Sequence, residues 1–283
     1  MIRVGGVPEH FNLPWHMGLE SGAFSDAGLE VTYIDFPGGT GALTRALEND
    51  ELDVAIVLSE GVTAAILNGN PSRIIKTYVD SPLIWGIHTG ANSAVLSEEQ
   101  MAGKRYAISR FGSGSHLMAI VDAAQRGLHI RKEQFVPVGN IEGAREALSK
   151  GEADLFLWEK FMTKPLVDAG EFRRIGETRT PWPCFMAATP EKFLAHHHQD
   201  LKTLLNVVSQ QAQKLMNDPK AASIIAKRYG LQVEDAAEWF ADTSWSLDMD
   251  IPTKALESVI TALNNLGIVR APDAKPMDVF AEL

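Results

Sequence analysis

The sequence predicts an α/β protein made of two similar, Rossmann-like lobes, with a set of helices at the C-terminus. Three observations support this fold class. Short β-rich runs alternate with helix-like stretches, the segments around Asp53 and Asp154 resemble each other, and the chain beyond Pro183 is mostly helix-like. Alternating strands and helices with short connections form parallel sheets under right-handed crossovers. We therefore expect two parallel sheets, each covered by helices.

The first lobe is predicted to open with strands and helices in alternation. Gly-rich and Pro-containing turns separate these elements. The run VAIVL is apolar throughout, which is typical of a strand buried on both faces of a parallel sheet. The predicted strands are 2–7, 29–36, 53–58 and 72–79, and the predicted helices are 13–21, 41–48 and 61–67.

The same order of elements then begins again. At an offset of 101 residues, Ala46–Leu47 aligns with Ala147–Leu148, Glu51 with Glu152, and Asp53 with Asp154. We interpret this alignment as an internal repeat. The alternative is that helix–turn–strand units often place an acidic residue before a buried strand. The predicted strands of the second lobe are 104–109, 135–138 and 154–158, and its predicted helices are 115–126 and 142–148.

The C-terminal region is predicted to be helical after one short strand. Gly230 and Gly267 are natural helix ends. Because no strand-rich partner remains at this end, the helices must cover one of the two lobes. The predicted strand is 185–189, the predicted helices are 200–216, 219–229, 233–241 and 252–266, and the tail from 270 is loop-like.

Composition excludes several classes of protein. The chain has 283 residues, of which 45% are apolar and 22% charged, so we expect a folded chain with a sizeable core. The formal charge is −10 and no basic run occurs, which argues against nucleic acid as a partner. The single cysteine, Cys184, excludes a disulfide framework and a zinc site built from several cysteines. The uncharged stretch 81–96 is too polar for membrane insertion.

Four stretches carry a further resemblance. They are LPWHMGLESGAFSDAGLEVTYIDFPGGTGALTRAL at 13–47, ELDVAIVLSEG at 51–61, SRFGSGSHLM at 109–118 and GEADLFLWEKFMTKPL at 151–166. Together they resemble the type II periplasmic-binding-protein superfamily, in the branch with the SsuA-like alkanesulfonate, nitrate and thiamine-precursor binding proteins. The resemblance implies a ligand cleft between two lobes. Lobe one would comprise 1–89 and 183–283 with the C-terminal helices, lobe two would comprise 90–182, and the hinges would lie near 79–88 and 184–189.

The loop SRFGSGSH at 109–116 is the first candidate binding segment. It follows a predicted strand and precedes a helix, where glycines allow close approach and N–H groups favour polar oxygens. Its candidate ligand-binding residues are Arg110, Gly112, Ser113 and His116. The alternative is a helix start capped by Ser113 or Ser115.

The strand ends supply the other polar candidates. Ligands of open α/β sheets lie beyond the carboxyl ends of the strands. We expect Glu159 to bind ligand and favour a structural role for Glu60, although paired carboxylates could also serve an amine ligand. The candidate ligand-binding residues at these ends are Gly39, Thr40, Ser59, Trp158 and Glu159.

Aromatic and histidine residues give weaker signals. Trp15, Trp85, Trp158 and Trp182 occupy predicted loops or strand ends and could stack on a planar ligand. We expect Trp15 to face the cleft, and ordinary core packing is the alternative. The run HHH at 196–198 is expected in a solvated loop rather than in a metal site.

The leading functional hypothesis is a solute-binding protein of the ABC-transporter type. It would close two lobes on a small organic molecule, either a sulfonate or carboxylate or a thiamine-precursor-like heteroaromatic. A transporter permease is a candidate partner, and no cofactor, metal or catalytic residue is expected. The alternatives are a cytoplasmic cofactor-biosynthesis enzyme of the same fold and a stand-alone ligand sensor. No apolar run of signal-peptide length is present, so we expect a cytoplasmic chain, or a periplasmic or lipid-anchored one whose leader was removed.

Overall fold

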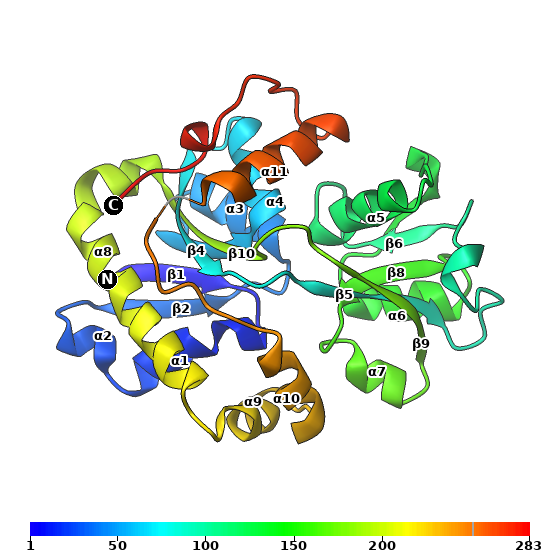
Figure 1. Cartoon of the computed structure of the whole chain (residues 1–283), viewed down its shortest axis with the longest axis horizontal. Coiled ribbons are helices and arrows are strands. Elements are labelled where there is room, and N and C mark those ends of the chain that lie inside the picture. Colours follow the sequence, from blue (N-terminus) through cyan, green and yellow to red (C-terminus); the bar gives the residue numbers. More distant parts are fainter. Residues whose placement is uncertain (251) are drawn as a thin grey trace. The chain divides into compact units, whose positions relative to one another are not determined.

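The computed structural model describes residues 1–250 and 252–283 (Figure 1). The chain divides into two compact units. Unit 1 comprises Met1–Pro82 and Pro181–Leu283, and unit 2 comprises Leu83–Thr180. Each unit contains its own five-stranded sheet with helices packed against it, which confirms the α/β class. The expectation of purely parallel sheets was wrong, because each sheet includes one strand that runs antiparallel to its neighbours.

The sheet of unit 1 has the order β2-β1-β3-β10-β4. Strand β1 is parallel to β2 and β3, whereas β10 runs antiparallel between β3 and β4. Its strands are β1 (Ile2–Gly6), β2 (Val31–Asp35), β3 (Val54–Leu58), β4 (Ser72–Val79) and β10 (Phe185–Pro190). Strand β3 is buried along its whole length, as its apolar sequence predicts.

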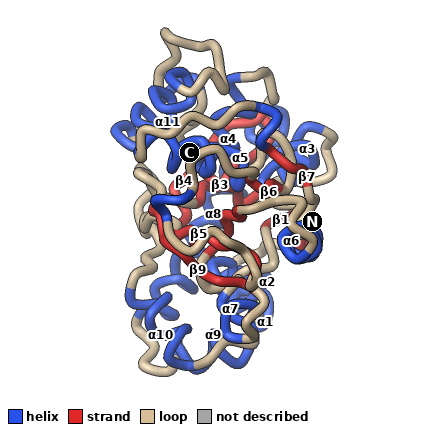
Figure 2. The backbone as a smooth tube through the Cα atoms, turned by 90° about the vertical axis from the view of Figure 1, so that its right-hand side faces the viewer, coloured by secondary structure: helices blue, strands red, loops and turns tan. Residues whose placement is uncertain are grey.

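Helices from both ends of the chain build the core of unit 1. Leu43 of α3, Val62 of α4 and Leu256 of α11 belong to one buried cluster with residues of β3 and β10. The C-terminal helices therefore complete unit 1, as expected. Figures 1 and 2 both show α9 beside α10 as a helical pair. The helices are α1 (Leu13–Glu20), α2 (Ala23–Asp26), α3 (Thr40–Glu48), α4 (Ser59–Leu67), α8 (Glu191–Met216), α9 (Ala221–Tyr229), α10 (Val233–Ala241) and α11 (Thr253–Asn265).

Unit 2 repeats this arrangement with the strand order β7-β6-β8-β5-β9. Again the first three strands are parallel and the fourth is antiparallel to both neighbours. The strands are β5 (Ile84–Gly90), β6 (Tyr106–Ile108), β7 (Phe135–Pro137), β8 (Leu155–Glu159) and β9 (Phe172–Arg179), and the helices are α5 (Gly114–Gln125), α6 (Ile141–Ser149) and α7 (Lys164–Asp168).

The internal repeat is visible in one polar motif that occurs in both units. Asp53 accepts hydrogen bonds from the backbone N–H, Nε and Nη2 of Arg3, and Asp154 accepts the same three from Arg105. In each unit the aspartate precedes the central parallel strand and the arginine lies at the start of its neighbour. The equivalence of Asp53 and Asp154 therefore has a shared structural cause.

The unit boundaries differ from the lobe boundaries expected at 89/90 and 182/183. The chain passes between units at Pro82–Leu83 and at Thr180–Pro181. Residues 84–90 belong to unit 2 because β5 hydrogen-bonds to β8 and β9. The segment 184–189, expected as a hinge, lies largely in β10 in the middle of the unit 1 sheet.

The start of α8 also differs from the prediction. The helix begins at Glu191 rather than near 200, so the HHH run at 196–198 lies inside a helix and not in a loop. The backbone departs from helical geometry at His197, where φ is −126° and ψ is 29°. Across the described part of the chain, no helix is long and apolar enough to cross a membrane.

Candidate functional site

In unit 1, the strand-end segments around Thr40 and Ser59 are packed together. The Oγ1 atom of Thr40, the first residue of α3, accepts a hydrogen bond from the N–H of Leu58 at 3.0 Å. A Cβ atom at Gly61 would lie 2.5 Å from Cγ2 of Thr40, so glycine permits this contact between the starts of α3 and α4. Gly39, with φ of +66°, supplies the left-handed backbone that begins α3.

Glu60 is the most unusual polar group at this end of the sheet. The residue is 1% exposed, and its Oε2 accepts a hydrogen bond of 2.9 Å from Nε1 of Trp182. Its Oε1 is buried and has no hydrogen-bond partner among the described residues. Desolvation raises the pKa of Glu60 to about 7, because burial penalises the charged form.

Ser59 is held by the segment that returns from unit 2. Its hydroxyl donates to the carbonyl oxygen of Pro183, and its N–H donates to the carbonyl oxygen of Cys184 at 3.0 Å. Trp182 of the same segment contacts Glu60. The returning segment therefore contacts the start of α4 at three points, and the Ser59 hydroxyl serves the fold.

Trp15 does not occupy the position expected for it. It is 0% exposed and packs against the rings of Phe24, Tyr33 and Tyr78, with centroid separations of 5.8, 6.4 and 6.2 Å. The tryptophan thus belongs to the core of unit 1, which is the alternative that the sequence left open.

In unit 2, the loop before α5 is organised by serine hydroxyls. Ser113 is the N-cap of α5: its Oγ accepts from the N–H of His116 at 3.3 Å and donates to the carbonyl oxygen of Arg110 at 2.7 Å. The Oγ of Ser115 accepts from the N–H of Ser109 at 2.9 Å and lies 3.1 Å from Oγ of Ser113. The alternative of a helix start capped by Ser113 is therefore confirmed, and ligand binding by this loop stays a prediction.

The exposed side of this loop carries an aromatic residue that the sequence analysis did not select. Phe111 is 46% exposed and makes an edge contact with His116 at a centroid separation of 5.3 Å. Gly112 adopts φ of +78°, and its N–H donates to Nδ1 of His116 at 3.1 Å. Burial lowers the pKa of His116, so Nδ1 remains a hydrogen-bond acceptor.

The end of β8 holds the last two candidates. Glu159 is buried, and its Oε2 accepts a hydrogen bond of 2.6 Å from the N–H of Met162. Trp158 is half-buried and stacks on Phe156 at 5.2 Å. Glu159 and Trp158 therefore lie where the repeat predicted them, at the end of the central strand.

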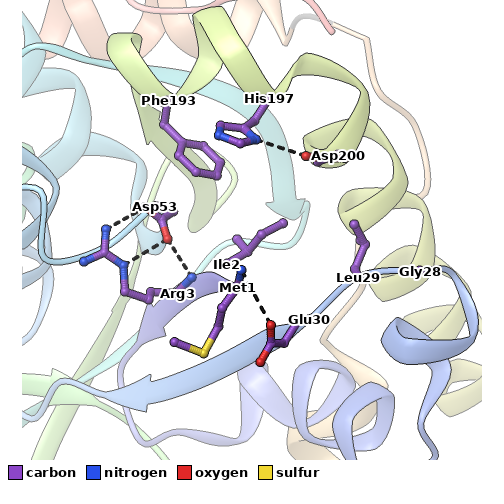
Figure 3. Close-up of a pocket in the computed structure, with 10 residues that line it drawn as sticks. All are labelled: Met1, Ile2, Arg3, Gly28, Leu29, Glu30, Asp53, Phe193, His197 and Asp200. Carbon is purple, nitrogen blue, oxygen red and sulfur yellow. Dashed lines mark hydrogen bonds and ion pairs between the residues drawn. The ribbon is translucent and has the colours of Figure 1, made fainter.

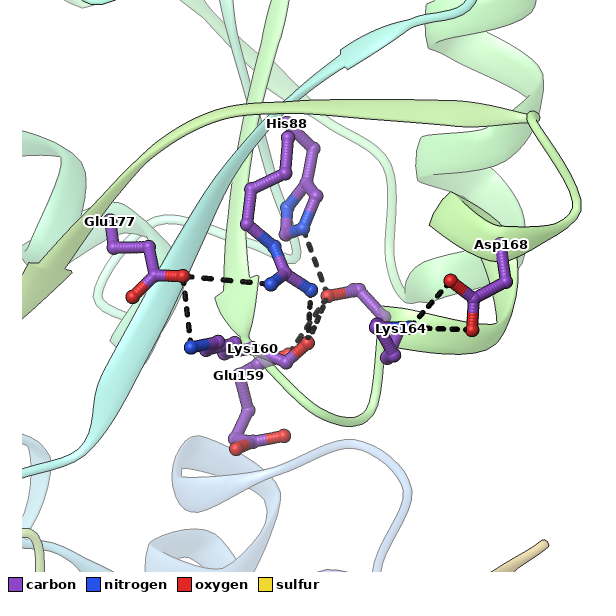
Figure 4. A network of polar contacts seen from close by, with 8 residues as sticks. His88, Glu159, Lys160, Lys164, Asp168 and Glu177 are labelled. Carbon is purple, nitrogen blue, oxygen red and sulfur yellow. Dashed lines mark hydrogen bonds and ion pairs between the residues drawn. The ribbon is translucent and has the colours of Figure 1, made fainter. Parts of the chain in front are cut away.

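A polar network behind Glu159 fixes the turn that follows β8 (Figure 4). Oγ1 of Thr163 lies 3.0 Å both from the carbonyl oxygen of Glu159 and from Nε2 of His88. Nζ of Lys160 is 3.0 Å from Oε1 of Glu177. Burial lowers the pKa of His88 to about 3, so this ring is a neutral structural element.

A separate cavity of about 500 Å³ lies at the opposite end of the unit 1 strands (Figure 3). Arg3, Asp53 and His197 are among its lining residues, and Nδ1 of His197 lies 3.0 Å from Oδ2 of Asp200. Arg3 and Asp53 satisfy each other there. Within residues 1–250 and 252–283, no group of three or more His, Cys, Asp or Glu side chains could hold a metal ion.

Comparisons with known proteins show which proteins this chain resembles. A family model described as Ca3427-like PBP matches residues 85–178, and no curated protein matches the chain in sequence. One similar solved structure is that of the Candida albicans CA3427 gene product, which is described as defining a new family of proteins with the generic periplasmic binding protein fold. It is 28% identical to this chain and has a TM-score of 0.90. The match covers 98% of this chain and 93% of that one.

Two further solved structures are similar in fold. The alkanesulfonate-binding protein SsuA from Xanthomonas axonopodis pv. citri, bound to MOPS, has a TM-score of 0.83 and 16% identity over 100% of this chain and 98% of its own. The chain has the type II periplasmic-binding-protein fold. PhnD1 from Prochlorococcus marinus, in complex with methylphosphonate, shares this periplasmic-binding-protein fold with a TM-score of 0.62 and 14% identity over 95% and 98% of the two chains.

The sequence analysis selected Thr40, Ser59 and Glu159, which the structure places at the start of α3, the start of α4 and the end of β8, respectively. Ligand binding by these residues stays a prediction. The sequence favoured a structural role for Glu60, and it did not connect Glu60 with Trp182, which is distant in sequence. An acidic residue directly after a fully apolar strand was the available signal, because such a position is buried at the carboxyl end of the sheet.

Proposed function

We propose that the chain is a solute-binding protein that closes its two units on one small organic molecule. The fold supports this proposal, since SsuA and PhnD1 share it and are solved with MOPS and methylphosphonate, respectively. A binding protein of this kind responds to ligand through its higher affinity for the closed form. We further propose an ABC-transporter permease as the partner that receives the ligand.

The single observation that carries the proposal is the ordered loop before α5. Ser113 and Ser115 fix the backbone there, so the first-turn N–H groups of a helix of 12 residues are held in a defined geometry. Such N–H groups favour ligand oxygens, and Arg110 adds a positive charge in the same loop. The loop is therefore suited to a sulfonate, carboxylate or similar oxygen-bearing group, which is the first ligand class considered from the sequence.

A ligand screen tests this proposal. Melting curves of the full chain are recorded with small sulfonates, phosphonates and carboxylates, and titration calorimetry then measures the affinity of each compound that stabilises the protein. We expect at least one compound to raise the melting temperature, because a ligand that binds only the folded state stabilises it. Arg110→Gln should weaken its binding about tenfold, the usual effect of one charge-assisted hydrogen bond.

The exposed residue Arg131 provides the matched control for this variant. Arg131→Gln removes the same charge from unit 2 outside the loop and should leave the affinity unchanged. Equal effects of the two substitutions, or no stabilisation by any compound, would count against the proposal.

A further inference from the structure

The surroundings of Glu60 show a hydrogen-bonding requirement that the protein itself meets only in part. One carboxyl oxygen accepts the indole N–H of Trp182, and the other is buried without a partner among the described residues. No basic side chain of the described chain forms an ion pair with Glu60, so neutralisation by a neighbouring cation does not explain its burial.

Burial without a full set of hydrogen bonds is costly for a carboxyl group. An unsatisfied buried acceptor costs more than an ordinary hydrogen bond contributes, and a buried charge costs more again. Replacement by an apolar residue would remove that cost. The presence of an acid at this position therefore points to a group that is absent from the protein and donates a hydrogen bond to Oε1.

The location of Glu60 indicates where that donor comes from. Glu60 is the second residue of α4 and directly follows the strand β3, at the end of the sheet where ligands of α/β proteins bind. The hydroxyl groups of its neighbour Ser59 and of the adjacent Thr40 form hydrogen bonds with backbone groups. Of these three side chains, Glu60 is the one with a buried polar atom that has no hydrogen-bond partner among the described residues.

We propose that Glu60 binds an N–H donor of the ligand, either an amine or an amino-substituted heterocycle. This inference rests on the proposed function and adds ligand chemistry to it. A carboxyl in this position disfavours a purely anionic group at unit 1, whereas the loop before α5 suits an oxygen-bearing group. The expected ligand therefore carries nitrogen and oxygen functions at different places.

Matched pairs of probes test the inference. Each pair has the same size and differs by an amino group in place of a methyl group: aminopropanesulfonate against butanesulfonate, aminobutanoate against pentanoate, and aminopyrimidine against methylpyrimidine. Titration calorimetry measures both members with the wild-type chain, with Glu60→Gln and with Glu48→Gln. Glu48 is an exposed residue at the end of α3 and loses the same charge.

The inference predicts that in at least one pair the amino member binds the wild-type chain about tenfold more tightly than the methyl member. Glu60→Gln should remove most of this preference, and Glu48→Gln should preserve it. Equal or tighter binding of the methyl members by the wild-type chain overturns the inference whatever the variant does, and it leaves the proposed function intact. Binding of no probe at all counts against the proposed function as well.

Discussion

At the scale of single residues, the structure distinguishes candidate binding residues that pack in the core from those that do not. The sequence alone could not make this distinction. Trp15 of α1 packs among core rings, whereas Glu60 of α4 has one carboxyl oxygen without a partner among the described residues. The sequence shows that each residue lies near the start of a helix. It does not show which way a side chain points, because that depends on helix packing from distant segments.

Glu60 should make the stability of the chain depend on pH. Its folded-state pKa, about 7, lies above the ordinary value of 4.5, so the folded state holds a proton that the unfolded state has already lost. Stability from this group is therefore greatest at low pH and falls as the pH rises through this window. Between about pH 5 and about pH 8 the loss should be about 2 kcal/mol.

Glu60→Gln should remove this dependence, because glutamine does not titrate. The measurement is the free energy of unfolding in urea at both pH values for the wild-type chain and the variant. Other titrating groups are common to both proteins, so the difference between their pH slopes reports Glu60. Parallel slopes would show that the carboxyl is not desolvated in the folded state.

At the scale of elements, the loop before α5 depends on local backbone requirements. Gly112 has φ of +78°, which L-residues with side chains rarely adopt. From the sequence we expect Gly112→Val to harm binding more than stability. The positive φ changes that expectation, because valine should cost about 1–2 kcal/mol of stability by itself. Gly112→Val is therefore a poor probe of binding.

Ser113→Ala is the better test of this element. It removes the N-cap hydroxyl of α5 and should lower the free energy of unfolding by about 1 kcal/mol. Ser149→Ala is the control, since Ser149 is an exposed residue at the end of α6 and should change stability by less than about 0.5 kcal/mol. Urea unfolding measures both. Equal effects would mean that the cap contributes nothing.

The repeated arginine–aspartate motif gives a second prediction at this scale. Desolvation by itself would raise the pKa of Asp53, but the hydrogen bonds and charge of Arg3 hold it below its ordinary value. Stability from this pair is present above the ordinary aspartate pKa and is lost as the pH falls through the lower, folded-state value. Asp53→Asn should lower the free energy of unfolding at neutral pH by about 2 kcal/mol.

Asp154→Asn should also lower the free energy of unfolding, but by less than Asp53→Asn. The Asp154 side chain is 25% exposed against 10% for Asp53, so solvent screens its pair with Arg105 more strongly. Urea unfolding of the two variants beside the wild type measures this order. A larger loss for Asp154→Asn would contradict it.

Two strands that the sequence analysis did not predict show where an apolar sequence pattern fails to indicate a strand. Strands β5 and β9 were not predicted, since β5 contains His88, Thr89 and two glycines instead of an apolar run. His88 is buried there because the carbonyl oxygen of Phe156 and the hydroxyl of Thr163 satisfy its ring nitrogens. Those partners come from elements distant in sequence. By contrast, β3 and α5 follow from local patterns and were predicted with small errors at their ends.

At the scale of the whole molecule, two units of similar topology differ in how the chain builds them. In unit 2 all five strands come from one continuous segment. Its two ends are joined by hydrogen bonds from the N–H of Thr180 to the carbonyl oxygen of Leu83 and from the N–H of Leu83 to Oγ1 of Thr180. In unit 1, β10 comes from the returning chain and separates β3 from β4.

This difference predicts which part of the chain folds alone. A fragment spanning 83–180 should fold cooperatively, because it contains a complete sheet and a buried cluster around Phe156 and Phe172. A fragment spanning 1–82 should not, because without β10 the strand β4 has no neighbour in the sheet and the cluster loses Met186 and Leu256. Circular dichroism and urea unfolding of both fragments provide the measurement. A disordered 83–180 fragment, or a cooperatively folded 1–82 fragment, would show that the two units depend on each other in a way that their separate sheets and cores do not explain.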